Sequence, residues 1–338
     1  MSLLRKLTHK PQPHNSLSIP IVINRFFTTL NPDPNLNPFP DVPTSAYYDD
    51  LIHAAGRSRD FETVRHLLNK RVRDGCFNTS KTFNFITNTE TSLSVLDDLS
   101  QTLVRVDKGL PRKSAYDSLV SRLSKLGRID ESVRVVHEMA RGGIGLNACS
   151  FHPILNALTR KKEMNRARGV MKLMRQYQIL PDLKAHNYFL SAYCFIGDLA
   201  SATEVLTKMV EEGAKADTRT YDALVLGACS AGKVEAALVV WRSMVDDGVS
   251  VTLSTHMHVV KALLRLGYYE QAVEFVRILA GRDKWLDTYN FGCLASKLIR
   301  LKRFGEAKLV LEEMNERGLE IEDKLKDFYR MNIADKKN

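Results

Sequence analysis

Cationic side chains recur through this chain at the spacing of a repeat. Arg160 follows Lys125 by 35 residues, and Arg300 follows Arg265 by the same interval. Such side chains can neutralise the phosphates of a nucleic acid, and these contacts position the polymer without reading its sequence. The net charge of the chain is +10, which also favours a polyanionic partner. The alternative is a solvated helix surface. The cations of this column are Arg57, Lys125, Arg160, Arg265 and Arg300.

Histidine and cysteine give no pattern typical of a catalytic or metal centre. His256 and His258 lie two residues apart, which places their side chains on different faces of a helix. The five cysteines show no paired spacing, and Cys194 and Cys229 are one repeat apart on apolar helix faces, so we expect reduced structural thiols rather than disulfides or metal ligands. We therefore expect a protein that is not an enzyme and needs no cofactor.

The elements that position the cations are set by a ladder of aromatic and histidine residues. Its intervals are 35 residues except for one of 33, and alanine, methionine and glycine columns keep the same period. A fixed period of this size is typical of a solenoid, in which each unit packs on its neighbours, so the ladder is interpreted as core. The ladder residues are Tyr48, Phe83, Tyr116, Phe151, His186, Tyr221, His256 and Phe291.

Each unit is predicted to be a helical hairpin. In the sixth unit, apolar residues recur at helical spacing from Tyr221 to Cys229, residues 230–233 break the pattern, and a second helix is predicted from Val234 to Val245. The second unit is two residues short and lacks the turn glycine. The predicted units are 45–79, 80–112, 113–147, 148–182, 183–217, 218–252, 253–287 and 288–322.

Units such as HNYFLSAYCFIGDLASATEVLTKMVEEGAKAD (186–217) and TYDALVLGACSAGKVEAALVVWRSMVDDG (220–248) resemble pentatricopeptide repeats. The resemblance covers residues 45–322 and implies a P-type array, an all-α right-handed superhelical solenoid of 35-residue helix-turn-helix repeats, of the kind found in plant organelle RNA-binding proteins. A tetratricopeptide array is the close alternative, but its period is 34 residues and its tryptophan-leucine-glycine pattern is absent here.

The resemblance also implies a base-reading position. In such arrays the fifth and last residues of a unit select one base of a single RNA strand. Asn187 and Asp217 form the pairing associated with uracil. Met257 with Asp287 and Gly292 with Glu322 have no clear preference, because methionine and glycine lack the needed hydrogen-bonding side chain. The other pairs are Asp49 with Thr79, Asn84 with Arg112, Asp117 with Asn147, His152 with Asp182, and Asp222 with Thr252.

Further cations lie close to the same face. The cation column stands eight residues after the base-reading positions, which is about two helical turns. Lys81, Lys184 and Arg219 lie three residues before their readers, so we expect them to contact phosphates as well.

The two ends of the chain fall outside the period. Residues 1–31 contain basic residues and no acid, and Arg25-Phe26-Phe27 resembles a mitochondrial processing site. We predict a mitochondrial transit peptide over 1–27 and a matrix location; a chloroplast location and a basic start without a targeting role are the alternatives. A proline-rich lead-in is predicted over 28–44, and a helix with a short tail over 323–338, capping the last repeat.

The leading hypothesis is a non-catalytic mitochondrial protein that binds single-stranded RNA, as a factor for transcript stability, processing, splicing or translation. A structural or ribosome-associated repeat protein is the alternative within the same class. A protein-protein scaffold is the alternative from another class. No apolar run approaches the roughly 18 residues of a membrane span, so we expect no membrane-spanning segment.

Overall fold

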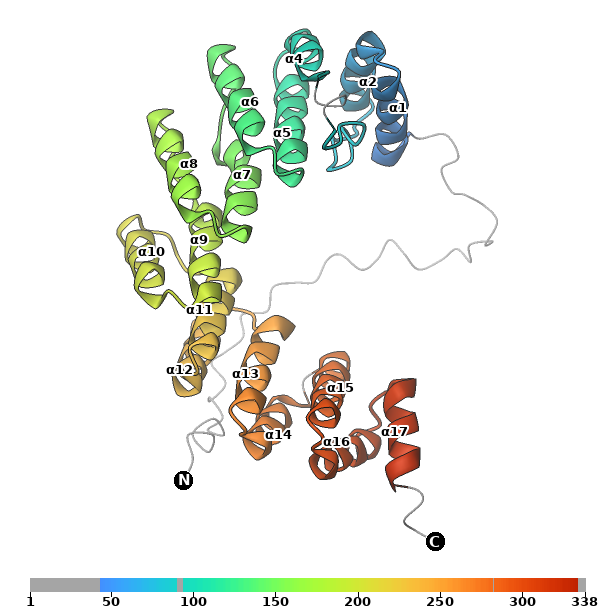
Figure 1. The fold of residues 1–338 in the computed structure, drawn as a ribbon, viewed down its shortest axis with the longest axis vertical. Helices are drawn as coiled ribbons and strands as arrows, with labels where there is room; N and C mark the ends of the chain where they lie inside the picture. The colour runs from blue at the N-terminus through green and yellow to red at the C-terminus, as the bar shows by residue number, and fades with distance from the viewer. Residues whose placement is uncertain (1–42, 90–93, 282, 334–338) are drawn as a thin grey trace, which may run out of the picture. The chain divides into compact units, whose positions relative to one another are not determined.

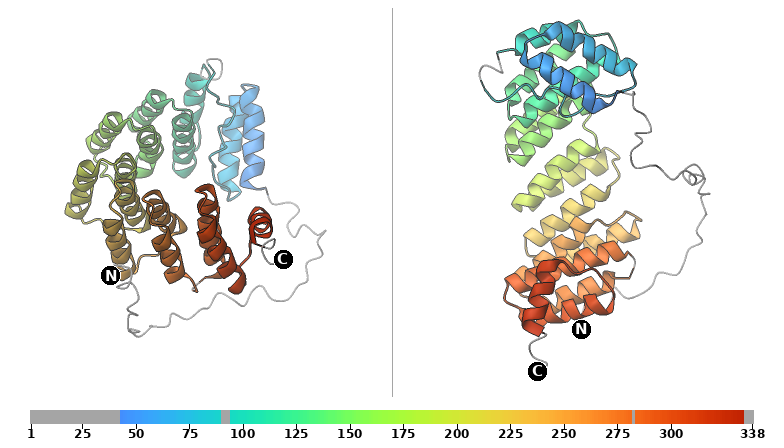
Figure 2. Two further views of the ribbon diagram at one scale, coloured as in Figure 1. Left: turned by 60° about the horizontal axis from the view of Figure 1, so that its bottom comes forward. Right: turned by 90° about the vertical axis from the view of Figure 1, so that its right-hand side faces the viewer.

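The computed structural model describes residues 43–89, 94–281 and 283–333, and these ranges contain α-helices joined by turns and short irregular segments (Figure 1). The chain divides between Pro181 and Asp182 into two compact units, here called the N-terminal unit and the C-terminal unit. The all-α fold predicted from the repeat period is confirmed for these ranges. Hairpins within each unit can be followed by colour in Figure 2.

The N-terminal unit contains hairpins in which a first helix packs on the second helix that follows it. The pairs α1 with α2, α5 with α6, and α7 with α8 pack in this way, and first helix α5 also packs on first helix α7. The helices are α1 (Ser45–Arg57), α2 (Phe61–Arg73), α4 (Leu96–Val104), α5 (Leu110–Lys125), α6 (Ile129–Arg141), α7 (Ala148–Arg160) and α8 (Met164–Gln176).

The C-terminal unit repeats this arrangement. First helices pack in succession, α9 on α11, α11 on α13 and α13 on α15, so they form a continuous row within this unit. The sixth repeat has its second helix at Val234, as the sequence predicts. The helices are α9 (Leu183–Ile196), α10 (Leu199–Glu211), α11 (Thr218–Ser230), α12 (Val234–Asp246), α13 (Leu253–Arg265), α14 (Tyr269–Leu279), α15 (Lys284–Arg300), α16 (Phe304–Glu316) and α17 (Asp323–Ile333).

The aromatic and histidine ladder forms the interior of both units. All eight ladder residues are buried, with exposed fractions from 0% for Phe151 and Phe291 to 9% for Tyr221. The alanine column is buried as well, which lets the helices of a hairpin approach closely. These burials confirm the interpretation of the ladder as core, including its two histidines.

Polar ladder residues also tie the two helices of a hairpin together. The Tyr48 hydroxyl donates a hydrogen bond to Asp74, and the Tyr221 hydroxyl donates one to Asp247. Both aspartates are C-cap residues of the second helix and lie 26 residues after their tyrosine. His186 contacts Glu212 at the same interval, with 2.7 Å between Nε2 and Oε2. These contacts fix the end of the second helix against the first.

The second unit differs from its prediction as a helical hairpin. Residues 80–85 form consecutive turns instead of a first helix, and α4 is a helix of only 9 residues. The Thr79 hydroxyl accepts a hydrogen bond from the Lys81 N–H, and the Thr82 hydroxyl accepts one from the Thr79 N–H. Local bonds of this kind compete with helix hydrogen bonds, and this stretch is rich in threonine, asparagine and serine.

Other boundaries shift by a few residues. Helix α5 begins at Leu110 rather than near 113, and α15 begins at Lys284 rather than near 288. The predicted transit peptide at 1–27 lies outside the described residues, as does the lead-in at 28–44 except for 43 and 44. In the predicted C-terminal cap, the described helix α17 buries Leu325 and packs Phe328 and Tyr329 against the core, whereas Met331 is exposed.

Candidate nucleic-acid interface

The predicted base readers lie on first helices, with one exception. Asn84 lies in the turn segment that replaces the first helix of the second unit. The others share a position in the first half of their helix: Asp49 in α1, Asp117 in α5, His152 in α7, Asn187 in α9 and Asp222 in α11.

The last residue of most units has a structural task of its own. Four of these residues are N-caps of the next first helix, and the side chains of Asp182, Asp217 and Thr252 accept the N–H of the residue three positions on. Aspartate, asparagine and threonine are favoured at N-caps whatever else they do. Helix capping therefore explains the residue type at the last position of these four units without any base reading. The four N-caps are Asn147, Asp182, Asp217 and Thr252.

The pair Asn187 and Asp217 is brought into direct contact. Asn187 Nδ2 donates to Asp217 Oδ1 at 2.9 Å, and the Thr220 hydroxyl lies 2.8 Å from Asn187 Oδ1. Burial raises the pKa of Asp217, but hydrogen bonds from Thr220 and Asn187 outweigh it and leave the pKa below its usual value. The carboxylate is therefore ionised at neutral pH and fixes the orientation of the amide.

A column of buried hydroxyls, which the sequence analysis missed, holds the readers in place. In each case a residue 33 positions after the reader donates to it: Thr82 to Asp49 (2.9 Å), Ser150 to Asp117 (2.7 Å), Thr220 to Asn187 (2.8 Å) and Thr255 to Asp222 (2.8 Å). All four hydroxyl residues are 0% exposed. Their recurrence at the third position of a unit was the signal available in the sequence.

Replacing Thr220 with valine should weaken base selection by the fifth unit. The hydroxyl fixes the Asn187 amide, and a hydrogen bond of this type contributes about 1 kcal/mol, so we expect discrimination between bases to fall about fivefold. Binding of RNAs that differ at one base checks this. Thr255→Val is the matched control, because it releases Asp222 instead. Equal effects of both variants on the same base would contradict the prediction.

Asp49 is engaged differently from the other readers. The Asp49 residue is 4% exposed, and its carboxylate forms a 2.9 Å ion pair with the fully buried Arg71 and accepts hydrogen bonds from Thr79 and Thr82. The predicted pair Asp49 and Thr79 is thus in contact, but the carboxylate has no free face for a base. The geometry favours a structural role for Asp49.

Asp117 and Asp222 keep partial exposure. Lys113 forms an ion pair with Asp117 and also lies 3.4 Å from Asn147 Oδ1, so it bridges that predicted pair. The Asp222 carboxylate accepts a hydrogen bond from the Thr255 hydroxyl, and His258 Nε2 lies 3.6 Å from Asp222 Oδ2. Burial raises the pKa of Asp222, whereas the His258, Thr255 and Ser254 contacts lower it, and the net shift is downward.

In three other predicted pairs, individual members are buried or bonded to residues outside the pair. His152 is buried in α7 of the N-terminal unit, whereas Asp182 belongs to the C-terminal unit. Arg112 lies inside α5 and donates to the Val106 carbonyl, so it does not cap a helix. Met257 is buried, and Asp287 accepts from the Gly281 N–H at 2.8 Å.

The cation column has a common position in the fold. All five cations are the final residue of a first helix, and all are exposed. Arg57, Lys125, Arg160 and Arg300 have no ion-pair partner within the described residues. Arg265 instead donates to the Cys229 carbonyl at the end of α11, so part of its hydrogen-bonding capacity is already used. A cation at a helix C-terminus also stabilises the helix dipole.

The three additional cations are exposed as well. Lys184 and Arg219 stand in the first turn of α9 and α11, and Lys81 lies in the turn segment of the second unit. None of the three side chains has a hydrogen-bond or ion-pair partner in the described part of the chain. Each is therefore available to an anionic ligand.

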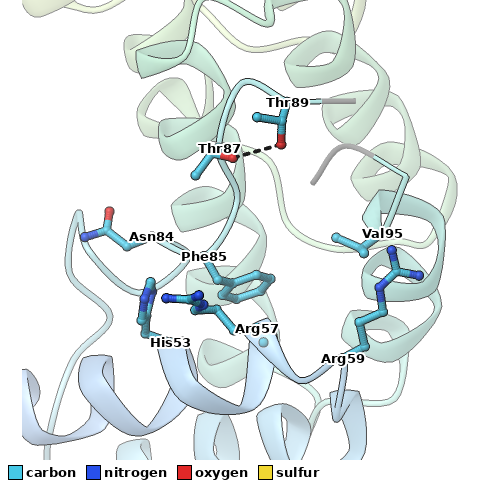
Figure 3. A pocket seen from close by; sticks show the side chains of 9 residues that line it. His53, Arg57, Arg59, Asn84, Phe85, Thr87, Thr89 and Val95 are labelled. Atoms are coloured by element: carbon cyan, nitrogen blue, oxygen red, sulfur yellow. Dashed lines mark hydrogen bonds between the residues drawn. The ribbon is translucent and has the colours of Figure 1, made fainter. Parts of the chain in front are cut away.

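A cavity of about 420 Å³ brings two of the predicted residues together. Asn84 and Arg57 line it beside His53, Arg59 and Phe85 (Figure 3). Phe85 lies against Gly56, where an added Cβ would come within 2.3 Å of the ring. The turn segment of the second unit therefore depends on this glycine, and it builds a cavity with two cations at its edge.

Arg59 shows a second cation position that sequence reasoning missed. It has a left-handed backbone (φ 58°) at the hairpin turn, where other repeats carry a glycine such as Gly197 (φ 79°). Lys162 and Lys302 occupy the same turn with φ 63° and 59°. This conformation favours glycine, so a cation here replaces the residue that local backbone geometry prefers.

Other chemistry is sparse in the described ranges. Residues 43–89, 94–281 and 283–333 contain no cluster of three or more histidine, cysteine or acidic residues arranged to hold a metal. Burial raises the pKa of Cys194 to about 11 and that of Cys229 to about 12, so both thiols are protonated. Within the same ranges, no helix combines the length and the apolar character required to cross a bilayer.

Comparison with known proteins accounts for the repeated unit. Three family models match: a pentatricopeptide repeat domain over residues 134–195, a pentatricopeptide repeat-containing protein over 196–307, and a PPR repeat over 114–144. A mitochondrial pentatricopeptide repeat-containing protein of Arabidopsis thaliana is 48% identical over 98% of this chain and 95% of its own length. The chain belongs to the pentatricopeptide repeat family. A second mitochondrial pentatricopeptide repeat protein of that plant is 46% identical, over 98% of this chain and 93% of its own length.

Solved pentatricopeptide repeat structures resemble the chain more distantly. The protein PPR10, crystallised with an 18-nucleotide RNA element, matches with a TM-score of 0.47 and 16% identity over 83% of this chain and 40% of PPR10. The pentatricopeptide repeat domain of an Arabidopsis thaliana protein-only RNase P, in complex with tRNA, matches with a TM-score of 0.34 and 15% identity over 64% of this chain and 97% of that domain.

Proposed function

We propose that this pentatricopeptide repeat protein binds single-stranded RNA in the mitochondrial matrix and acts by occupying or positioning that RNA, without catalysis. The observation that carries the proposal is the set of exposed cations at the ends of α1, α5, α7 and α15, which have no ion-pair partner in the described residues. Such side chains suit phosphate contacts from a single strand. The two mitochondrial relatives support the location.

Reading of the RNA sequence is limited to a few units. Asn187 and Asp49 are both 4% exposed, but Asn187 is a neutral amide that its neighbours orient, whereas Asp49 is held in an ion pair and Met257 has no polar side chain. We infer that affinity comes mainly from the cations and that, among the units whose fifth residue is polar, the fifth unit contributes most of the base selection. Stability, processing, splicing and translation of a transcript all remain within this proposal.

Sequencing of RNA crosslinked to the protein in purified mitochondria tests the proposal. One enriched transcript segment supports a transcript factor, and enriched ribosomal RNA supports a ribosome-associated role. Absence of crosslinked RNA would contradict RNA binding and favour the protein scaffold. The ribosomal role has one observation in its favour: a small ribosomal subunit protein of Arabidopsis thaliana is 20% identical over 55% of this chain and 54% of its own length.

Replacing Asn187 with threonine should change which base the fifth unit prefers. By family resemblance the preference should move from uracil toward guanine, while total affinity changes by no more than roughly 1–3 kcal/mol, the contribution of a single base contact, because the cations are untouched. Binding selection on randomised RNA measures both quantities. Ser191→Thr, a change one helical turn further along α9, is the control. Identical preferences for parent and variant would show that this unit does not read sequence.

Residues 1–44 should direct a reporter to mitochondria. The segment is basic and free of acids up to Asp33, and Arg25-Phe26-Phe27 predicts removal of the residues before Thr28. Microscopy of the fusion and sequencing of its mature N-terminus check the two parts separately. Arg5→Glu with Lys6→Glu is the control, since it should abolish import. A cytosolic or chloroplast reporter would contradict the mitochondrial location.

A further inference from the structure

The first helix of the eighth repeat is longer than its counterparts. Helix α15 has 17 residues, whereas α7, α11 and α13 have 13 each. The extra turn begins after Asp283, whose side chain accepts the Leu286 N–H as an N-cap. It adds Trp285 four residues before Tyr289, which places both rings on one side of the helix (α15 is marked in Figure 1).

These two rings form an open aromatic surface. Their centroids are 6.0 Å apart with an angle of 28° between the planes, so they stack on each other. Trp285 is 68% exposed and Tyr289 is 44% exposed. Large exposed aromatic rings are costly to leave in water, and stacked rings of this kind are a surface on which nucleic-acid bases stack.

A cavity of about 540 Å³ lies beside the rings, and it includes the base-reading position of this repeat. That position is Gly292, where an added Cβ would meet only Met314 Cε, at 4.0 Å. The glycine is therefore not required by packing. Its missing side chain leaves room at the place where other repeats carry a polar reader.

The polar residues of the cavity carry both signs of charge. Lys297 and Arg300 supply cations, and Glu320 and Glu322 supply carboxylates. None of the four forms an ion pair with a described residue. The cavity thus combines a stacking surface, acceptors for N–H groups and cations for a phosphate, which are the contacts that a nucleotide needs.

We propose that this cavity binds a guanine of the RNA, and this inference rests on the RNA binding proposed above. Guanine carries two adjacent donors on its Watson–Crick edge, N1–H and the N2 amino group, and a carboxylate can accept from both. Adenine, cytosine and uracil place an acceptor beside their donor on that edge, which a carboxylate repels. The eighth repeat therefore selects its base with Glu320 and Glu322, after stacking it on Tyr289 and Trp285.

Fluorescence titration with uridine-rich oligoribonucleotides that contain one guanosine or one adenosine tests the proposal. The chain has two tryptophans, and Trp241 is buried at 8% exposure, so a change in emission on binding reports Trp285. We expect the guanosine RNA to quench the emission and to bind about tenfold more tightly than the adenosine RNA, the size of one good base contact. Trp285→Phe should remove the quenching.

Two variants separate the stacking from the selection. Gly292→Leu fills the cavity, so it should abolish quenching and the guanosine preference while binding to oligouridine persists. Glu320→Gln with Glu322→Gln keeps the cavity and should retain the quenching but remove the preference. Thermal unfolding checks that both variants fold. If oligouridine binds but neither RNA alters the emission, or if the double glutamine variant keeps its preference, the guanine site is overturned while RNA binding stands. If no RNA binds at all, both proposals fail.

Discussion

Replacing Arg57, Lys125 and Arg160 together with glutamine should weaken RNA binding by about 100-fold at 0.1 M salt, with little dependence on the RNA sequence. The three cations end the first helices α1, α5 and α7 of the N-terminal unit and are exposed. Each lost phosphate contact on a single strand lowers the slope of log affinity against log salt by about 0.7, so the slope should fall by about 2. Titrations between low and high salt measure both effects.

A matched variant removes the same charge from the other helix of each hairpin. Lys70, Arg141 and Lys172 are exposed cations on α2, α6 and α8 of the same unit. Their replacement with glutamine lowers the net charge equally and should leave the slope nearly unchanged. Equal losses in the two variants would show that total charge, and not the ends of the first helices, attracts the RNA. An unchanged slope in the first variant would remove those cations from the interface.

Replacing Asp49 with asparagine should destabilise the N-terminal unit by about 3–5 kcal/mol, because it leaves the Arg71 charge buried without its counterion. Arg71 is 0% exposed, and it also donates to Thr82 and to the Ser45 carbonyl, so it connects α1, α2 and the turn segment. Chemical denaturation measures the free energy of unfolding. Base preference of the RNA bound by the folded variant should stay the same.

Asp117→Asn provides the control for this variant. Asp117 holds the same position in α5, but its ion pair with Lys113 is about one quarter exposed on each side, so breaking it should cost less than about 1 kcal/mol. If Asp49→Asn were no more destabilising than Asp117→Asn, the buried ion pair would not anchor the unit. A change of base preference in Asp49→Asn would return Asp49 to the base-reading column.

The repeat period predicts most of the helices because the unit is short and its packing is local. Each hairpin buries its ladder residue and its alanine against the next helix. A periodic column of such residues therefore predicts both a helix and the neighbouring helix on which it packs. The second unit departs from the period because its threonine hydroxyls bond nearby backbone N–H groups, and this competition is decided by local side chains rather than by the repeat. The extra turn of α15 follows from the Asp283 cap, which lies outside the repeat pattern.

The sequence by itself determined the hairpin unit, its membership of one periodic array, the buried ladder and the exposed cation column, because each of these depends on residue type at a fixed interval. Only the tertiary structure decided how each reader is held. Asp49 and Asn187 occupy the same position of their units, yet one is neutralised by a buried arginine and the other is an amide oriented by Asp217 and Thr220. That difference arises because Arg71 meets Asp49 across the first hairpin, whereas the Thr220 hydroxyl that contacts Asn187 comes from the following repeat. The fifth and last residues of a unit do not report either of these partners.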